Sequence, residues 1–234
     1  MNNQSNISAI AWDLDNTLFD RDAAFRRLLT AWLAGQTKLE AEGDAIRKMT
    51  AQLMLLDQSG YGDRMEVCRE AAAMAGSLVP AGDLRAEIHQ RLADFVSPDR
   101  RTTDLLRTLS RRFPMAVVTN GAVTLQRAKI ARAGLSPFFP ADAVIISAEV
   151  GFEKPDARIF KIAEERLGVP ASEVLFIGDH VENDIAGAAR AGMKTCWVAL
   201  GRERDPGLAA DIVVNEAWEL TLDMIDAPAP GVPV

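Results

Sequence analysis

Short apolar runs separated by helical segments constrain the fold of this chain more than any other feature of its sequence. The runs are near-continuously apolar and rich in Val, Ile or Trp, which is typical of strands buried on both faces of a parallel sheet. They lie at residues 7–13 (ISAIAWD), 115–120 (MAVVTN), 143–147 (AVIIS), 174–179 (VLFIGD) and 195–200 (TCWVAL), and DIVV at 211–214 is a shorter candidate.

Helical segments follow three of these runs, at residues 122–134, 156–168 and 182–192. Each of the three ends in Gly, the residue that helices prefer just beyond their last turn. Alternation of strands and helices is typical of α/β proteins. The sequence therefore predicts an α/β fold with a doubly wound, Rossmann-like parallel sheet.

Residues 20–96 break this alternation, because no convincing strand occurs there. Instead, the segments 23–35, 42–56, 63–76 and 82–96 have the apolar spacing of amphipathic helices. We expect residues 1–19 and 97–234 to form an α/β core, and residues 20–96 to form a smaller helical domain inserted after the first strand.

Composition and termini argue against several classes of partner. The chain has 33 acidic and 26 basic residues and a formal net charge of −7, which argues against a nucleic-acid polymer as ligand. No apolar run approaches the roughly 18 residues that a membrane span needs, and the first residues, MNNQSNIS, do not resemble a signal peptide. Cys68 and Cys196 form no metal or redox motif, so we expect buried thiols and a cytoplasmic location.

Polar side chains follow the predicted strands at the points where those strands end. Because the carboxyl ends of parallel strands lie along one edge of the sheet, these residues should meet in one crevice. They are Asp13 and Asp15 after the first run, Thr119, Asn120 and Gly121 after the second, Lys154 in the loop after the third, and Asp179 after the fourth, with Asp184 near the start of the next helix.

The acidic residues of this set predict a metal site. Four carboxylates in one crevice repel one another, and a hard cation relieves that repulsion. Oxygen ligands suit Mg²⁺, which also bridges to phosphate oxygens. Asp13, Asp15, Asp179 and Asp184 are therefore candidate metal ligands.

The remaining residues of the set suit a phosphoryl group. The Lys154 ammonium, the Thr119 hydroxyl and the backbone N–H groups of Asn120 and Gly121 can bind phosphate oxygens. A carboxylate such as Asp13 can attack phosphorus, and Asp15, two residues further on, can act as general acid. Taken singly, each residue fits a blander interpretation, such as a solvated turn, a helix cap or a surface lysine. Those interpretations would have to hold at four strand ends together.

Four motifs in order, DLDNT, TNG, EKPD and GDHVEND, resemble those of the haloacid dehalogenase superfamily of phosphatases. The resemblance covers nearly the whole chain and is weakest in the helical insertion, which lies where that family has a helical cap. It implies that Asp13 is the nucleophile and Asp15 the general acid and base. It also implies that Thr119 and Lys154 bind the transferring phosphoryl group.

The same resemblance implies a Mg²⁺ cofactor held by Asp13, Asp179 and the backbone carbonyl of Asp15, with Asp184 supporting the site. The expected activity is hydrolysis of a small phosphorylated metabolite, and the form of the motifs is most similar to members acting on nucleoside monophosphates. A dehalogenase, a phosphonate hydrolase, a sugar-phosphate mutase and a phosphate-binding regulatory protein are the alternatives. We expect a monomer or homodimer that binds neither membrane nor nucleic-acid polymer.

Overall fold

The chain divides into two compact units, Met1–Phe19 with Pro98–Val234, and Asp20–Ser97. The structure is a computed structural model that describes residues 6–36, 43–203, 207 and 209–227. We refer to the first unit as the α/β unit and to the second as the helical unit. Among the described residues, no helix is both long enough and apolar enough to cross a membrane.

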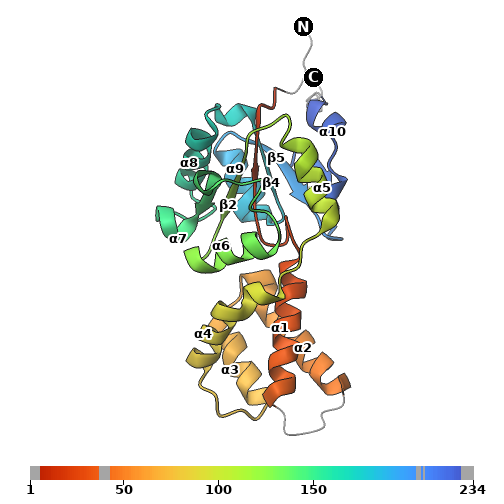
Figure 1. Cartoon of the computed structure of the whole chain (residues 1–234), viewed down its shortest axis with the longest axis vertical. Coiled ribbons are helices and arrows are strands. Elements are labelled where there is room, and N and C mark those ends of the chain that lie inside the picture. Colours follow the sequence, from red (N-terminus) through yellow and green to blue (C-terminus); the bar gives the residue numbers. More distant parts are fainter. Residues whose placement is uncertain (1–5, 37–42, 204–206, 208, 228–234) are drawn as a thin grey trace. The chain divides into compact units, whose positions relative to one another are not determined.

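A parallel sheet forms the centre of the α/β unit (Figure 1). In the part of the chain that the structure describes, six strands lie in the order β3-β2-β1-β4-β5-β6, and every neighbouring pair is parallel. The strands are β1 (Ala9–Trp12), β2 (Met115–Thr119), β3 (Val144–Ile146), β4 (Val174–Gly178), β5 (Lys194–Val198) and β6 (Ile212–Val214). The α/β fold with a parallel sheet, predicted from the apolar runs, is confirmed.

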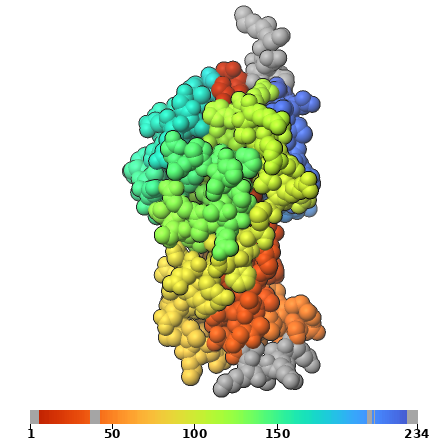
Figure 2. Space-filling view, in the orientation of Figure 1, coloured from red at the N-terminus to blue at the C-terminus, as the bar shows by residue number. Residues whose placement is uncertain are grey.

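Helices cover both faces of this sheet, with α8 and α5 on opposite sides in Figure 1. In the space-filling view, the side chains of the covering helices hide strand β1 (Figure 2). The longer helices are α5 (Arg100–Leu109), α6 (Val123–Arg132) and α8 (Ala157–Leu167), and the shorter ones are α7 (Ser147–Val150), α9 (Gly187–Arg190) and α10 (Leu222–Asp226). Short 3₁₀ turns occur at Ala141–Ala143, Ala171–Glu173 and Ala217–Glu219.

The core on one face of the sheet follows the two-residue period of the strands. Ala9 and Ala11 of β1 and Phe176 of β4 point into one buried cluster with Ile159 and Phe160 of α8. The rings of Phe160 and Phe176 pack edge to face, with 5.2 Å between their centroids. This packing fixes α8 on the sheet.

Two segments differ from the sequence-based expectation. The segment predicted as one helix over 182–192 begins as a π-helical turn, Val181–Ala186, and continues as the short helix α9. Helix α5 was not predicted at all, although Asp99 caps its first turn by accepting a hydrogen bond of 2.8 Å from Arg101 N. Leu106 and Leu109 of α5 are fully buried.

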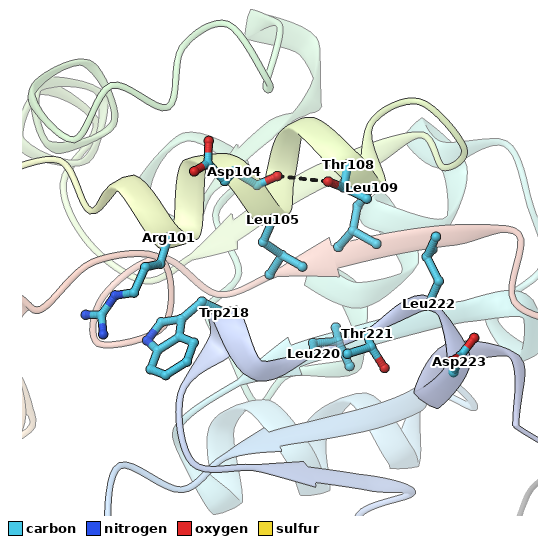
Figure 3. A pocket seen from close by; sticks show the side chains of 10 residues that line it. All are labelled: Arg101, Asp104, Leu105, Thr108, Leu109, Trp218, Leu220, Thr221, Leu222 and Asp223. Carbon is cyan, nitrogen blue, oxygen red and sulfur yellow. Dashed lines mark hydrogen bonds between the residues drawn. The ribbon is translucent and has the colours of Figure 1, made fainter.

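A groove runs between α5 and the C-terminal segment of the α/β unit (Figure 3). Leu105 and Leu109 line it on one side, and Trp218 and Leu220 line it on the other. The Arg101 guanidinium lies 4.5 Å from the centroid of the Trp218 ring, a cation–π contact that joins the two segments.

The helical unit is built from α1 (Arg21–Gln36), α2 (Gly43–Asp57), α3 (Arg64–Met74) and α4 (Ala81–Arg91), with 3₁₀ turns at Gln58–Gly60 and Leu92–Phe95. The fully buried Asp57 carboxylate forms ion pairs with Arg21 and Arg64. Arg64 NH1 lies 2.7 Å from Asp57 Oδ1. Both guanidinium groups stack on the Phe25 ring. A buried carboxylate is tolerated when it is paired in this way, so these contacts tie α1, α2 and α3 together.

The two cysteines are separate thiols, as the sequence predicted. Cys68 lies in the helical unit and Cys196 in the α/β unit, and both are buried and free. Burial raises the pKa of the Cys196 thiol to about 12, which keeps it protonated and unreactive at neutral pH.

We predict that Phe160→Ala lowers the free energy of unfolding of the α/β unit by about 3–5 kcal/mol, since it removes a fully buried ring and leaves a cavity. Urea denaturation followed by fluorescence measures this loss. Leu78→Ala is the control, because Leu78 is 99% exposed and its truncation should change stability by less than about 0.5 kcal/mol. A loss below about 1 kcal/mol for Phe160→Ala would contradict the packing described here.

Candidate active site

Asp13 lies at the carboxyl edge of the sheet, where β1 meets its two neighbours. Strand β1 pairs with β2 on one side and with β4 on the other. The backbone N–H of Asp13 donates to Ile177 O of β4 at 2.8 Å, which continues the ladder to the last residue before the turn. Asn16, with φ of 60°, then turns the chain in the left-handed conformation that Asn tolerates.

Three carboxylates meet beside this strand end. Oxygens of Asp13, Asp179 and Asp184 lie within 4.8 Å of one another, and the residues are 4%, 2% and 0% exposed. Gly178 makes room for the group, because a Cβ at this position would lie 2.5 Å from the Asp184 side chain. The Asp184 carboxylate also accepts the His180 N–H at 2.9 Å, which fixes it at the start of the π-helical turn.

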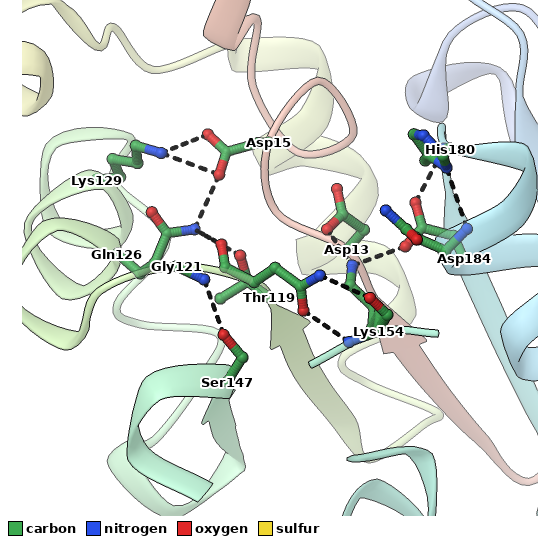
Figure 4. A network of polar contacts seen from close by, with 12 residues as sticks. Asp13, Asp15, Thr119, Gly121, Gln126, Lys129, Ser147, Lys154, His180 and Asp184 are labelled. Carbon is green, nitrogen blue, oxygen red and sulfur yellow. Dashed lines mark hydrogen bonds and ion pairs between the residues drawn. The ribbon is translucent and has the colours of Figure 1, made fainter. Parts of the chain in front are cut away.

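Lys154 reaches two of these carboxylates from the opposite loop (Figure 4). Its Nζ lies 2.5 Å from Asp13 Oδ1 and 2.7 Å from Asp184 Oδ1, and the residue is 3% exposed. Asn120 holds the Lys154 backbone in place: its side-chain Nδ2 donates to Lys154 O at 2.9 Å and its Oδ1 accepts from Lys154 N at 2.8 Å. The Asn120 side chain thus positions the lysine.

The electrostatics of this cluster show a shortage of positive charge. Burial raises the pKa of Asp13 to about 7, and the nearby carboxylates add to this rise. The attraction of Lys154 opposes the rise but does not cancel it. Burial and the charges of Asp13 and Asp184 raise the pKa of Asp179 to about 8. Burial lowers the pKa of Lys154, but the two carboxylates that face it outweigh burial and raise it above its usual range. The lysine is therefore charged at neutral pH, while the acids resist ionisation.

This donor set fits a divalent cation. Three buried carboxylates face one buried ammonium, and raised pKa values are the expected result when a buried anionic group lacks compensating charge. Oxygen donors at this spacing suit a hard metal ion. Among the described residues, Asp13, Asp179 and Asp184 could jointly bind this cation. The Asp15 carboxylate lies outside this group, and the role of its backbone carbonyl stays a prediction.

Asp15 lies apart from this cluster, where two residues that the sequence did not predict bind it (Figure 4). Lys129 Nζ lies 2.7 and 2.9 Å from the two carboxylate oxygens of Asp15. Gln126 Nε2 donates to Asp15 Oδ2 at 2.8 Å. Both residues are buried on α6, at 4% and 1% exposure. In the sequence, the helical spacing of Gln126, Lys129 and Ile130 places them on one face, but it does not reveal that this face is buried.

The residues at the end of β2 are placed close to Asp15. Gln126 Nε2 lies 2.5 Å from Thr119 Oγ1, so one amide group links Thr119 to Asp15. Gly121, with φ of 142°, donates its N–H to Ser147 Oγ at 3.0 Å. Phosphate binding by Thr119, Asn120, Gly121 and Lys154 stays a prediction.

A further contact at the acidic cluster was also missed. Arg202 NH2 lies 2.7 Å from Asp179 O and 3.3 Å from its Oδ2. Trp197 Nε1 donates to the same backbone oxygen at 2.9 Å. These contacts fix the segment after β4. No spacing in the sequence pointed to Arg202, because it reaches the site from the loop beyond β5.

Comparison with known proteins decides the family. Residues 7–192 match the family model described as haloacid dehalogenase-like hydrolase. The chain belongs to this family. The resemblance drawn from the four motifs is thereby confirmed.

Relatives of this haloacid dehalogenase-like hydrolase include several named phosphatases. Pyrimidine 5′-nucleotidase YjjG of Escherichia coli (strain K12) is 36% identical over 144 residues, which cover 61% of this chain and 63% of the relative. The match thus spans less than two thirds of that relative's length. A glyceraldehyde 3-phosphate phosphatase of Methanothermobacter thermautotrophicus is 30% identical over 203 residues, covering 82% of this chain and 85% of the relative.

A solved structure shares the fold. The putative hydrolase YfnB from Bacillus subtilis, whose crystal structure is bound to magnesium, has a TM-score of 0.73 and 24% sequence identity with this chain. The match covers 91% of this chain and 96% of that one. At this identity the likeness shows the fold alone.

We predict that the metal-free hydrolase loses stability as pH rises from 6.5 to about 8. The pKa values of Asp13 and Asp179 in the folded protein lie near 7 and 8, against an ordinary value of 3.8, so the folded state binds more protons than the unfolded state in this window. The free energy of unfolding therefore falls as pH rises. Burial lowers the pKa of His180, whose contribution to the slope has the opposite sign, involves less than one proton, and ends about one pH unit above the ordinary value of 6.5.

Thermal denaturation in EDTA at several pH values measures this slope. Asp179→Asn, which cannot ionise, should flatten it, and added Mg²⁺ should reverse it by binding the ionised carboxylates. An equal slope in the wild type and in Asp179→Asn would contradict the prediction.

A second prediction concerns Gly178. Gly178→Ala places a methyl group against the Asp184 side chain, so the carboxylate must shift and divalent-cation affinity should fall at least about tenfold. Calorimetric titration with Mg²⁺ and Mn²⁺ measures the affinity. Gly35→Ala is the control, because a Cβ there meets nothing within 4 Å. Unchanged affinity in a folded Gly178→Ala protein would show that Asp184 does not support the ion.

Proposed function

We propose that this chain is a Mg²⁺-dependent phosphatase that hydrolyses a small phosphorylated metabolite through an aspartyl-phosphate on Asp13. The observation that carries the proposal is the buried cluster of Asp13, Asp179 and Asp184, in which Asp13 and Asp184 bind the Lys154 ammonium. Such a cluster has oxygen donors and too little positive charge, which is what a cation requires, and that cation with Lys154 would then attract an anionic phosphoryl group. Membership of the hydrolase family and the named phosphatase relatives support it.

The first chemical step transfers the phosphoryl group to the protein. An Asp13 carboxylate oxygen attacks phosphorus, and the bond between phosphorus and the ester oxygen breaks. The departing alkoxide takes the proton of the Asp15 carboxyl group. Lys154 and Thr119 bind the phosphoryl oxygens during the transfer. Bound Mg²⁺, held by Asp13, Asp179 and Asp184, would supply positive charge that lets an anionic substrate approach a carboxylate nucleophile.

The second step returns Asp13 to its starting state. A water molecule attacks phosphorus while the Asp15 carboxylate takes one of its protons. The bond between phosphorus and the Asp13 oxygen then breaks and inorganic phosphate leaves. Asp15 ends this step protonated and ready for the next turnover, so one residue serves as acid and then as base.

The substrate we favour is a nucleoside monophosphate. The form of the motifs DLDNTLFD and GFEKPD suggested it, and the similarity to a pyrimidine 5′-nucleotidase supports it. A cytoplasmic location accords with two buried free thiols.

Hydrolysis of p-nitrophenyl phosphate tests the proposed function. We expect turnover with Mg²⁺ and none in EDTA, with recovery when Mg²⁺ is restored. Asp13→Asn should reduce turnover by several orders of magnitude, because the nucleophile is lost while the shape of the side chain is kept. Asp142→Asn, an exposed acid in the same unit, is the matched control and should keep wild-type activity.

Two results would contradict the proposal. Full activity of Asp13→Asn would exclude the covalent intermediate on that residue. Full activity in metal-free buffer would exclude the requirement for a cation.

A further inference from the structure

The ion pair between Lys129 and Asp15 is unusual because its lysine is almost fully buried. The Asp15 side chain is 22% exposed and that of Lys129 is 6% exposed. Withdrawing a lysine ammonium from water is costly unless it is paired. Here both Asp15 oxygens face Nζ, at 2.7 and 2.9 Å, so the pairing is bidentate.

Gln126 adds a second constraint on the same carboxylate. Because a carboxylate only accepts hydrogen bonds, the amide nitrogen of Gln126 must face Asp15, at 2.8 Å. The same nitrogen lies 2.5 Å from Thr119 Oγ1, which accepts in this contact. The hydroxyl of Thr119 therefore keeps its own proton as a donor for another oxygen.

One helix supplies both constraints. Gln126 and Lys129 lie three residues apart on α6 and therefore share a face of the helix. Gly121 permits the close approach of this face, because a Cβ there would lie 3.0 Å from the Gln126 side chain. Gln126 therefore binds Asp15 on the side of Thr119, whereas Lys154 binds Asp13 and Asp184 (Figure 4).

We propose that Lys129 and Gln126 are positioning residues that keep the Asp15 carboxyl group beside Thr119 and apart from the acids that hold the cation. This inference rests on the proposed function, in which Asp15 exchanges a proton with the leaving oxygen. A carboxylate close to a divalent cation is drawn to it by charge. The bidentate contact with Lys129 opposes that movement and keeps Asp15 where the ester oxygen departs.

Two aryl esters of nearly equal size test the inference. Phenyl phosphate releases a phenolate, whose conjugate acid has a pKa of about 10, and therefore needs a positioned acid. p-Nitrophenyl phosphate releases a much better leaving group and needs it less. In Lys129→Met, kcat/KM for phenyl phosphate should fall by roughly 10–10²-fold, which is a part of the full effect of a general acid. In the same variant, kcat/KM for p-nitrophenyl phosphate should change by less than about threefold.

A double-mutant cycle separates positioning from general damage. If Lys129 acts through Asp15, then Lys129→Met introduced into Asp15→Asn should not change the ratio of the two kcat/KM values further. Lys161→Met is the matched control, because Lys161 is an exposed lysine on α8 whose ion pair joins neighbouring turns. Gln126→Met gives a second test of the same kind should Lys129→Met fail to fold, as judged by circular dichroism.

The outcomes distinguish this inference from the proposed function. A changed ratio in Lys129→Met that is absent in the Asp15→Asn background supports positioning. Equal losses with both esters, or a changed ratio that persists in that background, would overturn the inference while the wild type stays active. A wild type inactive toward both esters would overturn the proposed function itself.

Discussion

A buried ammonium group, that of Lys154, lies between Asp13 and Asp184, and the rest of the site depends on this contact. Parallel strands bring their carboxyl ends to one edge of the sheet, so acids that follow β1 and β4 necessarily approach one another. Without opposite charge the cluster would be unstable, because buried carboxylates repel and lack solvation. Lys154, with Arg202 beside Asp179, offsets only part of that charge, as the raised pKa values of Asp13 and Asp179 indicate. The remaining deficit is the physical reason for expecting a cation, whose charge would in turn allow an anionic substrate to bind.

The polar residues of the crevice fall into two sets with separate tasks. Lys154 binds the acids suited to a metal, whereas Lys129 binds Asp15. A nucleophile and a general acid act at different positions: the first must reach phosphorus beside the cation, and the second must lie at the leaving oxygen. Two structural elements hold the two lysines in these separate places. Asn120 fixes the loop that bears Lys154, and α6 presents Lys129 from one rigid face.

Much of this arrangement was predictable from the sequence, because strands buried on both faces appear as apolar runs and their ends as abrupt polar residues. The position of Asp13 beside Asp179 follows from that pattern alone. Lys129 and Gln126 were not predicted, because a lysine on a helix is usually exposed and only the tertiary fold shows that this face of α6 lies against Asp15. Helix α5 was missed for a related reason: it follows no apolar strand, and its start depends on the capping contact of Asp99. Arg202 reaches Asp179 from a loop, and loop geometry has no signature in residue spacing.

The central claim is that Asp13 becomes covalently phosphorylated, and trapping that intermediate tests it most directly. Asp15→Asn removes the base of the second step, so the protein should retain the phosphoryl group after reaction with p-nitrophenyl phosphate and Mg²⁺. Acid quenching within the first turnover, followed by proteolysis and mass spectrometry, locates the modified residue. The account predicts one phosphoryl group on the peptide that contains Asp13, and none when Asp13→Asn is combined with Asp15→Asn. A phosphoryl group on a different residue, or rapid release of p-nitrophenol without any phosphorylated protein, would contradict it.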